Sequence, residues 1–268
     1  MRKKFAYSAW LLFVLILIYA PILILAVYSF TDSTMIGSIR KFSVDNYVTL
    51  FTREDLRGMV VGTILLAVVS AVIATILATL GAIGAFYSGK FSKGLVNNLN
   101  HVPVVNADVV TGFSICILMV VEFGMDKASF VPLIIGHVVL TAPFVYLSIL
   151  PKLKQMDANL YEAALDLGAT PFKALYKVLI PQILPGIFSG FMLAITLSLD
   201  DYFVTTYTKP ATFDTISTYV VNATKGSQTE VKTALWALST LIFVVVVIVV
   251  ICMNLFNKND KEGGKVNV

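Results

Sequence analysis

The chain alternates between long uncharged stretches and shorter segments that carry most of its charged residues. Stretches without Asp, Glu, Lys or Arg cover residues 5–31, 58–89, 128–151 and 233–257. Two further apolar stretches are interrupted by acids: residues 103–121 contain Asp108, and residues 182–206 contain Asp200 and Asp201. About 20 apolar residues in a helix cross the hydrocarbon core of a bilayer. The pattern therefore predicts six spanning helices.

We expect an all-α integral membrane protein, since an all-helical bundle satisfies its backbone hydrogen bonds within lipid and no alternating strand pattern competes with it. The first apolar stretch is too long for a cleaved signal sequence and is interpreted as an uncleaved first span. The predicted membrane domain covers residues 1–256, followed by a polar tail at 257–268. The expected spans are 8–30, 60–86, 103–121, 130–150, 182–206 and 233–256, with a polar loop at 151–181.

Composition supports a membrane protein and gives it an orientation. Hydrophobic residues make up 57% of the chain and charged residues only 13%, against about 25% charged in soluble domains. Mean hydropathy is +0.85. Lys and Arg are more frequent on the side that carries both termini, which predicts cytoplasmic termini and a cytoplasmic loop 151–181. The net charge of +4 thus marks membrane flanks, and we expect lipid but no nucleic acid as a partner.

The polar loop contains a series of helix start and stop signals. Asp157 is suited to cap a helix that begins at residue 158, and Gly168 to end it in the left-handed conformation. Thr170 followed by Pro171 marks the start of a second helix, which is expected to stop at Pro181. The loop is therefore predicted to be two short helices.

Helices this short are marginal in water and need a surface to pack against. The first one presents small and apolar residues on one face: Leu160, Ala163, Ala164 and Leu167. Such a face suits insertion into a groove on another protein. It equally suits packing back onto the ends of the membrane helices, and spacing alone does not choose between the two.

The spacing Glu162-Ala163-Ala164, Gly168 and Ile180-Pro181 resembles the signature loop of the permease subunits of ABC import systems of the six-helix type I class. The segments "SFTDS", "FSVDNYVTLF", "ADVVTGFS" and "SLDDYFVTTY" are similar to the spermidine/putrescine permease branch of that family. Together the similar segments extend over most of the chain, from about residue 7 to residue 256.

This resemblance implies a transport subunit of a bacterial cell membrane that is not itself an enzyme. It implies that Glu162, Ala163, Ala164, Leu167, Gly168 and Pro181 couple the chain to a separate ATPase dimer. It further implies a second, similar permease subunit and an extracytoplasmic polyamine-binding protein. No cofactor is expected on this chain, with ATP and Mg on the ATPase.

The acids inside the apolar stretches are the candidate substrate residues. A carboxylate at the centre of a spanning helix costs about 2.5–3.5 kcal/mol on insertion scales, and such residues usually face a cavity. Polyamines are linear polycations that suit spaced carboxylates with aromatic walls. Asp108, Asp200 and Asp201, with Tyr202 and Phe113, are the candidates.

We expect the acids to lie in succession along a path, with one of Asp200 and Asp201 facing it and the other pairing with a neighbour or capping a helix break. The same acids could instead be helix-end groups in water or form structural pairs with Lys127 or Lys209.

Other readings of the sequence remain open or are excluded. "GAFYSGKF" at residues 84–91 resembles a phosphate-binding loop, but Phe91 occupies the position of the Mg-binding Ser or Thr, so ATP is expected to be hydrolysed elsewhere. His137 is expected to be a hydrogen-bonded packing residue. The alternative functions are a permease for another small solute, a cation-coupled secondary carrier and an intramembrane aspartyl protease.

Overall fold

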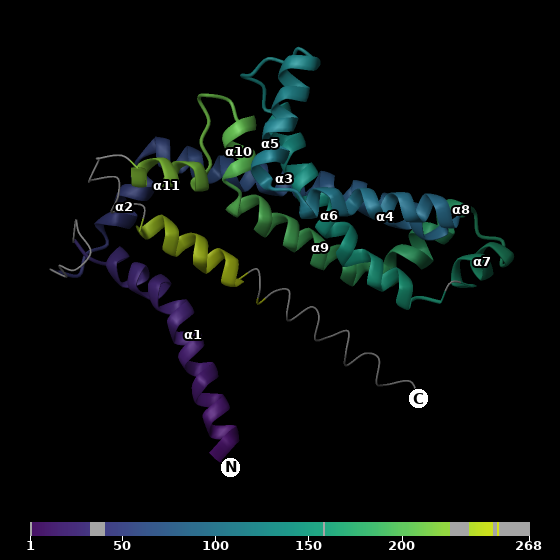
Figure 1. Cartoon of the computed structure of the whole chain (residues 1–268), viewed down its shortest axis with the longest axis horizontal. Helices are drawn as coiled ribbons and strands as arrows, with labels where there is room; N and C mark the ends of the chain where they lie inside the picture. Colours follow the sequence, from purple (N-terminus) through teal and green to yellow (C-terminus); the bar gives the residue numbers. More distant parts are fainter. Residues whose placement is uncertain (1, 33–40, 158, 226–235, 249–250, 252–268) are drawn as a thin grey trace. The chain divides into compact units, whose positions relative to one another are not determined.

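A computed structural model of the chain describes residues 2–32, 41–157, 159–225, 236–248 and 251, and most of these residues are helical (Figure 1). The first helices are α1 (Arg2–Ser29), α2 (Asp45–Thr52), α3 (Glu54–Tyr87) and α4 (Lys90–Val105). They are followed by α5 (Asp108–Cys116), the π-helix η1 (Ile117–Glu122), α6 (Val131–Gln155) and α7 (Asn159–Asp166). The last are α8 (Pro171–Ala174), the π-helix η2 (Leu175–Leu179), α9 (Ile180–Asp200), α10 (Phe203–Thr208) and α11 (Ile216–Lys225).

Four helices are long and apolar enough to cross a membrane: Trp10–Ser29, Leu56–Tyr87, Val131–Gln155 and Pro171–Asp200. A fifth span results if α4 and α5–η1, which meet at an angle of 104°, count as one. The apolar helix Trp236–Ile248 lies within the expected sixth span, but its described part is shorter than a bilayer requires. The described residues therefore contain up to five spans, and the predicted count of six is not confirmed.

The chain divides into two compact units. The first comprises Met1–Gly58 and Tyr219–Ile248. In it, the end of α1 is tied to the start of α2, because the Asn46 side chain donates hydrogen bonds to the backbone oxygens of Ser29 and Thr31 at 3.1 and 2.9 Å. An antiparallel bridge between Thr31 and Phe42 closes the same connection.

The second unit, Met59–Thr218 and Val249–Val268, contains a core of buried hydrophobic side chains. Helices α6 and α9 pack along each other, and their buried side chains contact a stripe of alanines on α3. Glycines allow the close approach: a Cβ on Gly190 would lie 3.1 Å from the Val145 Cα, and one on Gly186 would lie 3.1 Å from the Ser148 oxygen. The spacing of Gly186 and Gly190 thus serves helix packing, as small residues do in membrane bundles.

The connection between α6 and α9 differs from its prediction. The second helix does not stop at Pro181: α8, η2 and α9 form one continuous apolar helix, Pro171–Asp200. Pro181 has no backbone N–H to give to the preceding turn. The π-helical turn Leu175–Leu179 lies immediately before it, and such a turn is one way for a helix to absorb an interrupted hydrogen-bond ladder. The polar connection is therefore shorter than 151–181 and consists of residues 156–170.

Two predicted regions lie largely outside the described residues. They are the ends of the expected span 233–256 and the polar tail 257–268.

Candidate functional site

The break between α9 and α10 separates the two adjacent acids. Asp200 is the last residue of α9, and Asp201 has an extended backbone. The Asp201 carboxylate caps α10, since it accepts hydrogen bonds from the backbone N–H groups of Val204 at 3.2 Å and Thr205 at 2.7 Å. It also accepts a hydrogen bond from the Thr205 hydroxyl at 2.7 Å. A carboxylate at a helix start satisfies N–H groups that have no partner within the helix.

A buried histidine on α6 joins the two sides of this break. The Nδ1 atom of His137 lies 2.7 Å from the Ser198 hydroxyl on α9, and its Nε2 atom lies 2.9 Å from the Thr205 hydroxyl on α10. The same Nε2 atom is 3.8 Å from the Asp201 carboxylate. His137 is fully buried. The prediction that it is a hydrogen-bonded packing residue is confirmed, but its link to Asp201 was not foreseen.

A second break precedes Asp108. Helix α4 ends at Val105, and Asp108 is the first residue of α5. The Asn106 side chain donates a hydrogen bond to the Thr111 hydroxyl at 3.0 Å across this bend. Asp108 therefore does not interrupt one straight span over 103–121, as the sequence suggested. It lies at a helix start, where a negative charge interacts favourably with the helix dipole.

The helices that follow the two breaks pack side by side (Figure 1). A Cβ on Gly112 of α5 would lie 2.8 Å from the Val204 Cα of α10, so only glycine fits there without movement. The packing thus holds the two helix breaks on neighbouring helices. The contact joins the helix that begins at Asp108 to the helix that Asp201 caps. That the acids lie in succession along a path stays a prediction.

Exposure distinguishes the acids from one another. Asp108 and Asp200 are exposed, whereas Asp201 is 8% exposed. Two aromatic pairs lie on the same helices or at the break: the ring centroids of Phe113 and Tyr207 are 5.8 Å apart, and those of Tyr202 and Phe203 are 5.2 Å apart. Tyr207 was not singled out from the sequence. Carboxylates beside exposed aromatic faces are chemically suited to an organic ammonium group.

The connection 156–170 folds as its local signals predict. The Asp157 side chain accepts a hydrogen bond from the Asn159 N–H at 2.9 Å. Gly168 has a φ of 84° and ends α7 in a Schellman arrangement, in which Gly168 N–H donates to Leu165 at 2.8 Å and Ala169 N–H to Ala164 at 3.0 Å. The Thr170 hydroxyl accepts a hydrogen bond from Lys173 N–H at the start of α8.

The predicted coupling residues lie mostly on the surface of this connection. Glu162, Ala163, Leu167 and Gly168 are exposed, and Ala164 is half-buried. Leu167 is 89% exposed, the largest fraction among the large hydrophobic residues that the structure describes. Pro181 is also exposed, but it belongs to the continuous helix Pro171–Asp200 rather than to α7.

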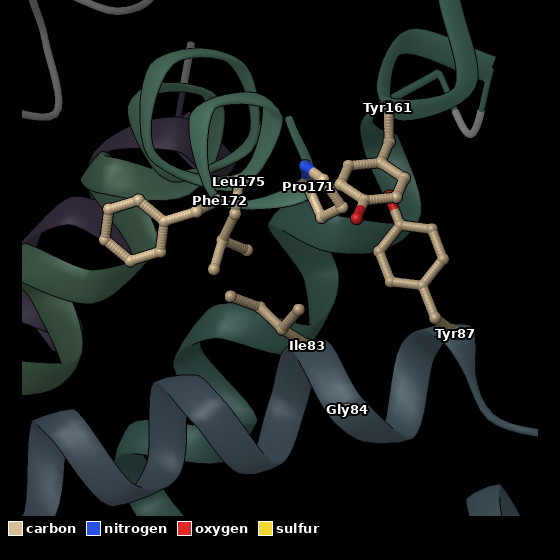
Figure 2. Close-up of a pocket in the computed structure, with 7 residues that line it drawn as sticks. All are labelled: Ile83, Gly84, Tyr87, Tyr161, Pro171, Phe172 and Leu175. Atoms are coloured by element: carbon tan, nitrogen blue, oxygen red, sulfur yellow. The ribbon is translucent and has the colours of Figure 1, made fainter. Parts of the chain in front are cut away.

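An apolar pocket of about 410 Å³ is lined by the end of α3, by α7 and by the start of the helix Pro171–Asp200, and Figure 2 shows the residues around it. Its walls are formed by Ile83, Gly84, Tyr87, Tyr161, Pro171, Phe172 and Leu175. The rings of Tyr87 and Tyr161 lie 5.3 Å apart, so α7 rests on α3 through aromatic contact. No sequence pattern indicated this pairing, since Tyr87 directly follows the predicted span 60–86 and Tyr161 lies in a separate loop.

Comparison with known proteins gives a consistent picture. Residues 78–259, more than half of the chain, match the model of the family described as "Binding-protein-dependent transport system inner membrane component". The chain is 32% identical to the putrescine transport system permease protein PotI of Escherichia coli K12, over 88% of this chain and 86% of that protein. It is 29% identical to the spermidine/putrescine transport system permease protein PotC of the same organism, over 92% and 91%.

The fold has close neighbours among solved structures. A chain from the crystal structure of a bacterial ABC transporter involved in the import of the acidic polysaccharide alginate superposes with a TM-score of 0.71. The two chains are 18% identical, and the match covers 97% of this chain and 96% of the other. The fold is therefore that of an ABC importer permease.

Proposed function

This chain belongs to the family of binding-protein-dependent transport system inner membrane components, and on that premise we propose that it is the permease subunit of an ABC importer for polyamines. The single observation that carries the choice of cargo is the acidic and aromatic cluster at the two helix breaks. The exposed residues Asp108 and Asp200 offer two negative charges, and the exposed Phe113 follows Asp108 on α5. The relatives named for putrescine and spermidine transport support the same choice.

The cluster has the chemistry that a linear polycation needs. Ammonium groups form charge-assisted hydrogen bonds with carboxylates, and the methylene segments between them pack against aromatic faces. Anions would be repelled from the same surface. Spermidine and putrescine both have ammonium groups separated by methylene segments. The charge of this cluster alone does not select between them.

The connection 156–170 is the proposed contact with the ATPase. Helix α7 has no buried residue. Glu162 and Ala163 on the helix and Leu167 just after it are exposed. An exposed leucine beside small residues suits insertion into a groove on a partner protein. ATP and Mg bind the ATPase dimer in this proposal, and its closure moves α7 to open and close the path. A second, similar permease completes the path, and an extracytoplasmic binding protein delivers the polyamine.

The orientation follows from the charge distribution. Lys and Arg are more frequent on the side with both termini and the connection 156–170, which supports a cytoplasmic position for α7, on the side of the proposed ATPase. The protein thus spans the bacterial inner membrane several times, with both termini in the cytoplasm.

Uptake of labelled spermidine tests the choice of cargo. The assay uses cells that lack their own polyamine importers and express the complete transporter. We expect unlabelled putrescine and spermidine to compete for uptake, and D108N and D200N each to reduce uptake without loss of the assembled complex. Competition by a sugar or an anion, with normal spermidine uptake in both variants, would reject a polyamine path through this cluster.

A further inference from the structure

We infer that the two adjacent acids have different roles: His137 and Asp201 hold the break between α9 and α10 in shape, and Asp200 with Asp108 faces the cargo. This inference rests on the proposed function and deepens it, because it assigns the cargo-facing carboxylates and adds His137 as a positioning residue. It is carried by burial and by the hydrogen bonds on both sides of the break.

Both oxygens of the Asp201 carboxylate already accept hydrogen bonds from within the protein. One oxygen accepts from Val204 N–H, and the other accepts from both the N–H and the hydroxyl of Thr205. Only 3% of its side chain is exposed. A cargo ammonium group would have to displace these hydrogen bonds and open α10 to reach it. Asp201 is therefore a structural cap.

The proton arrangement of the network ties His137 to that cap. The Thr205 hydroxyl has one proton, and it donates this proton to Asp201. Its oxygen then accepts a hydrogen bond from Nε2 of His137. In the neutral ring Nδ1 must be the acceptor, so the Ser198 hydroxyl donates to it. Ser198 lies on α9 and Thr205 on α10, so the His137 ring from α6 is hydrogen-bonded to both sides of the break.

Asp200 has the opposite surroundings. Within the described part of the chain its carboxylate has no hydrogen-bond or ion-pair partner, and the same holds for Asp108. The Asp200 backbone oxygen accepts a hydrogen bond from the Ser217 hydroxyl at 3.0 Å, which holds the main chain in place. Asp200 also ends α9, where the helix dipole is negative and favours a cation. The backbone of Asp200 is thus held in place, and the residue is exposed.

Cysteine accessibility distinguishes the two acids directly. In the complete transporter with C116A and C252A, the variants D108C, D200C and D201C are treated with a small cationic methanethiosulfonate reagent. We expect labelling of D108C and D200C, slowed by spermidine, and little labelling of D201C. The inference is overturned if D201C is labelled as fast as D200C and is equally protected by spermidine.

A second measurement covers the case in which D201C does not assemble, and it tests His137. In the D200C background, H137L removes both hydrogen bonds of the ring, whereas the amide of H137Q retains one donor and one acceptor. We expect H137L to raise the spermidine concentration needed for protection at least about tenfold, and H137Q to restore much of that protection. A purely structural defect would lower the amount of assembled complex, but it would not change the spermidine concentration needed for protection. Unchanged protection in H137L would refute the positioning role.

The outcomes separate this inference from the proposed function. If D108N and D200N both transport spermidine normally, the polyamine path fails as a whole. If D200N impairs uptake while D201C is labelled and protected like D200C, the path stands and the division of roles is wrong.

Discussion

Gly112 faces the backbone of Val204 so closely that a Cβ at position 112 would lie 2.8 Å from the Val204 Cα. This contact joins the two short helices that begin just after the breaks, and it therefore fixes how closely α5 approaches α10. Small residues at such crossings allow helix backbones in membranes to approach each other.

The substitution G112A should separate α5 from α10. We expect it to reduce spermidine uptake and to cost about 1–3 kcal/mol of stability, as overpacking does. Thermal stability of the purified complex and uptake at matched expression measure both effects. The matched control is G81A on α3, where nothing lies within 4 Å of an added Cβ. Equal behaviour of the two variants would show that the Gly112 contact does not control the site.

The substitutions D200N and D201N should affect different properties. D201N leaves an amide where a carboxylate accepted three hydrogen bonds, and lost bonds to a charged acceptor are worth about 1.5–3 kcal/mol each. We expect D201N to lower the melting temperature of the complex. D200N should leave the melting temperature unchanged and weaken the apparent affinity for spermidine. Thermal denaturation gives the melting temperature, and uptake kinetics give the apparent affinity for spermidine. A lower melting temperature in D200N and a weaker affinity alone in D201N would contradict the separate roles of the two acids.

The exposed face of α7 should respond to a change of charge. We expect E162K to reduce stimulation of the ATPase by the loaded binding protein, because Glu162 lies on the surface proposed to contact the ATPase. The same change at E122K, also exposed and helical, serves as the control and should have little effect. Normal ATPase stimulation and uptake in E162K would argue against this contact.

The end of α7 depends on a glycine. Because Gly168 has a positive φ, G168A is expected to cost about 1 kcal/mol and to loosen the end of the helix. Weaker coupling between ATP hydrolysis and uptake should follow. G89A is the matched control, since Gly89 has a φ of −60° before α4 and an added Cβ meets nothing within 4 Å. If the ratio of transport to hydrolysis is the same in both variants, the shape of this helix end is not used in coupling.

The aromatic contact between α3 and α7 should transmit movement of α7 to the membrane helices. Y161A removes the ring that lies 5.3 Å from Tyr87. We expect assembled transporters with ATPase activity but less uptake per ATP hydrolysed. Y176A, at an exposed tyrosine outside the pocket, is the comparison. If Y161A takes up as much spermidine per ATP hydrolysed as the unsubstituted protein, Tyr161 does not take part in coupling.

The sequence predicted local features well wherever neighbouring residues determine them. Asp157, Gly168 and Thr170 act on backbone groups within a few positions of themselves, so their roles as caps and stop could be read directly. Pro181 was misread because its effect depends on the preceding turn: a π-helical segment accommodates it, and the helix continues.

The site could be predicted only in part, because its geometry depends on residues far apart in the chain. His137 and Thr205 are 68 positions apart, and neither has a pattern that points to the other. Which of Asp200 and Asp201 faces the cargo likewise depends on which carboxylate turns inward at the helix break. The apolar composition of the stretch does not reveal that break. Acids in apolar stretches indicated that a site exists, and long-range packing determined its shape.

The central claim is that a separate ATPase drives cargo through this chain. Its most direct test is uptake of labelled spermidine into proteoliposomes that contain this chain alone, or this chain with its partner permease, ATPase and binding protein. We expect uptake only in the complete system with ATP on the side of the ATPase, and loss of uptake with a non-hydrolysable analogue. Full uptake by the chain alone, without nucleotide and driven by an ion gradient, would contradict the account and favour a cation-coupled carrier.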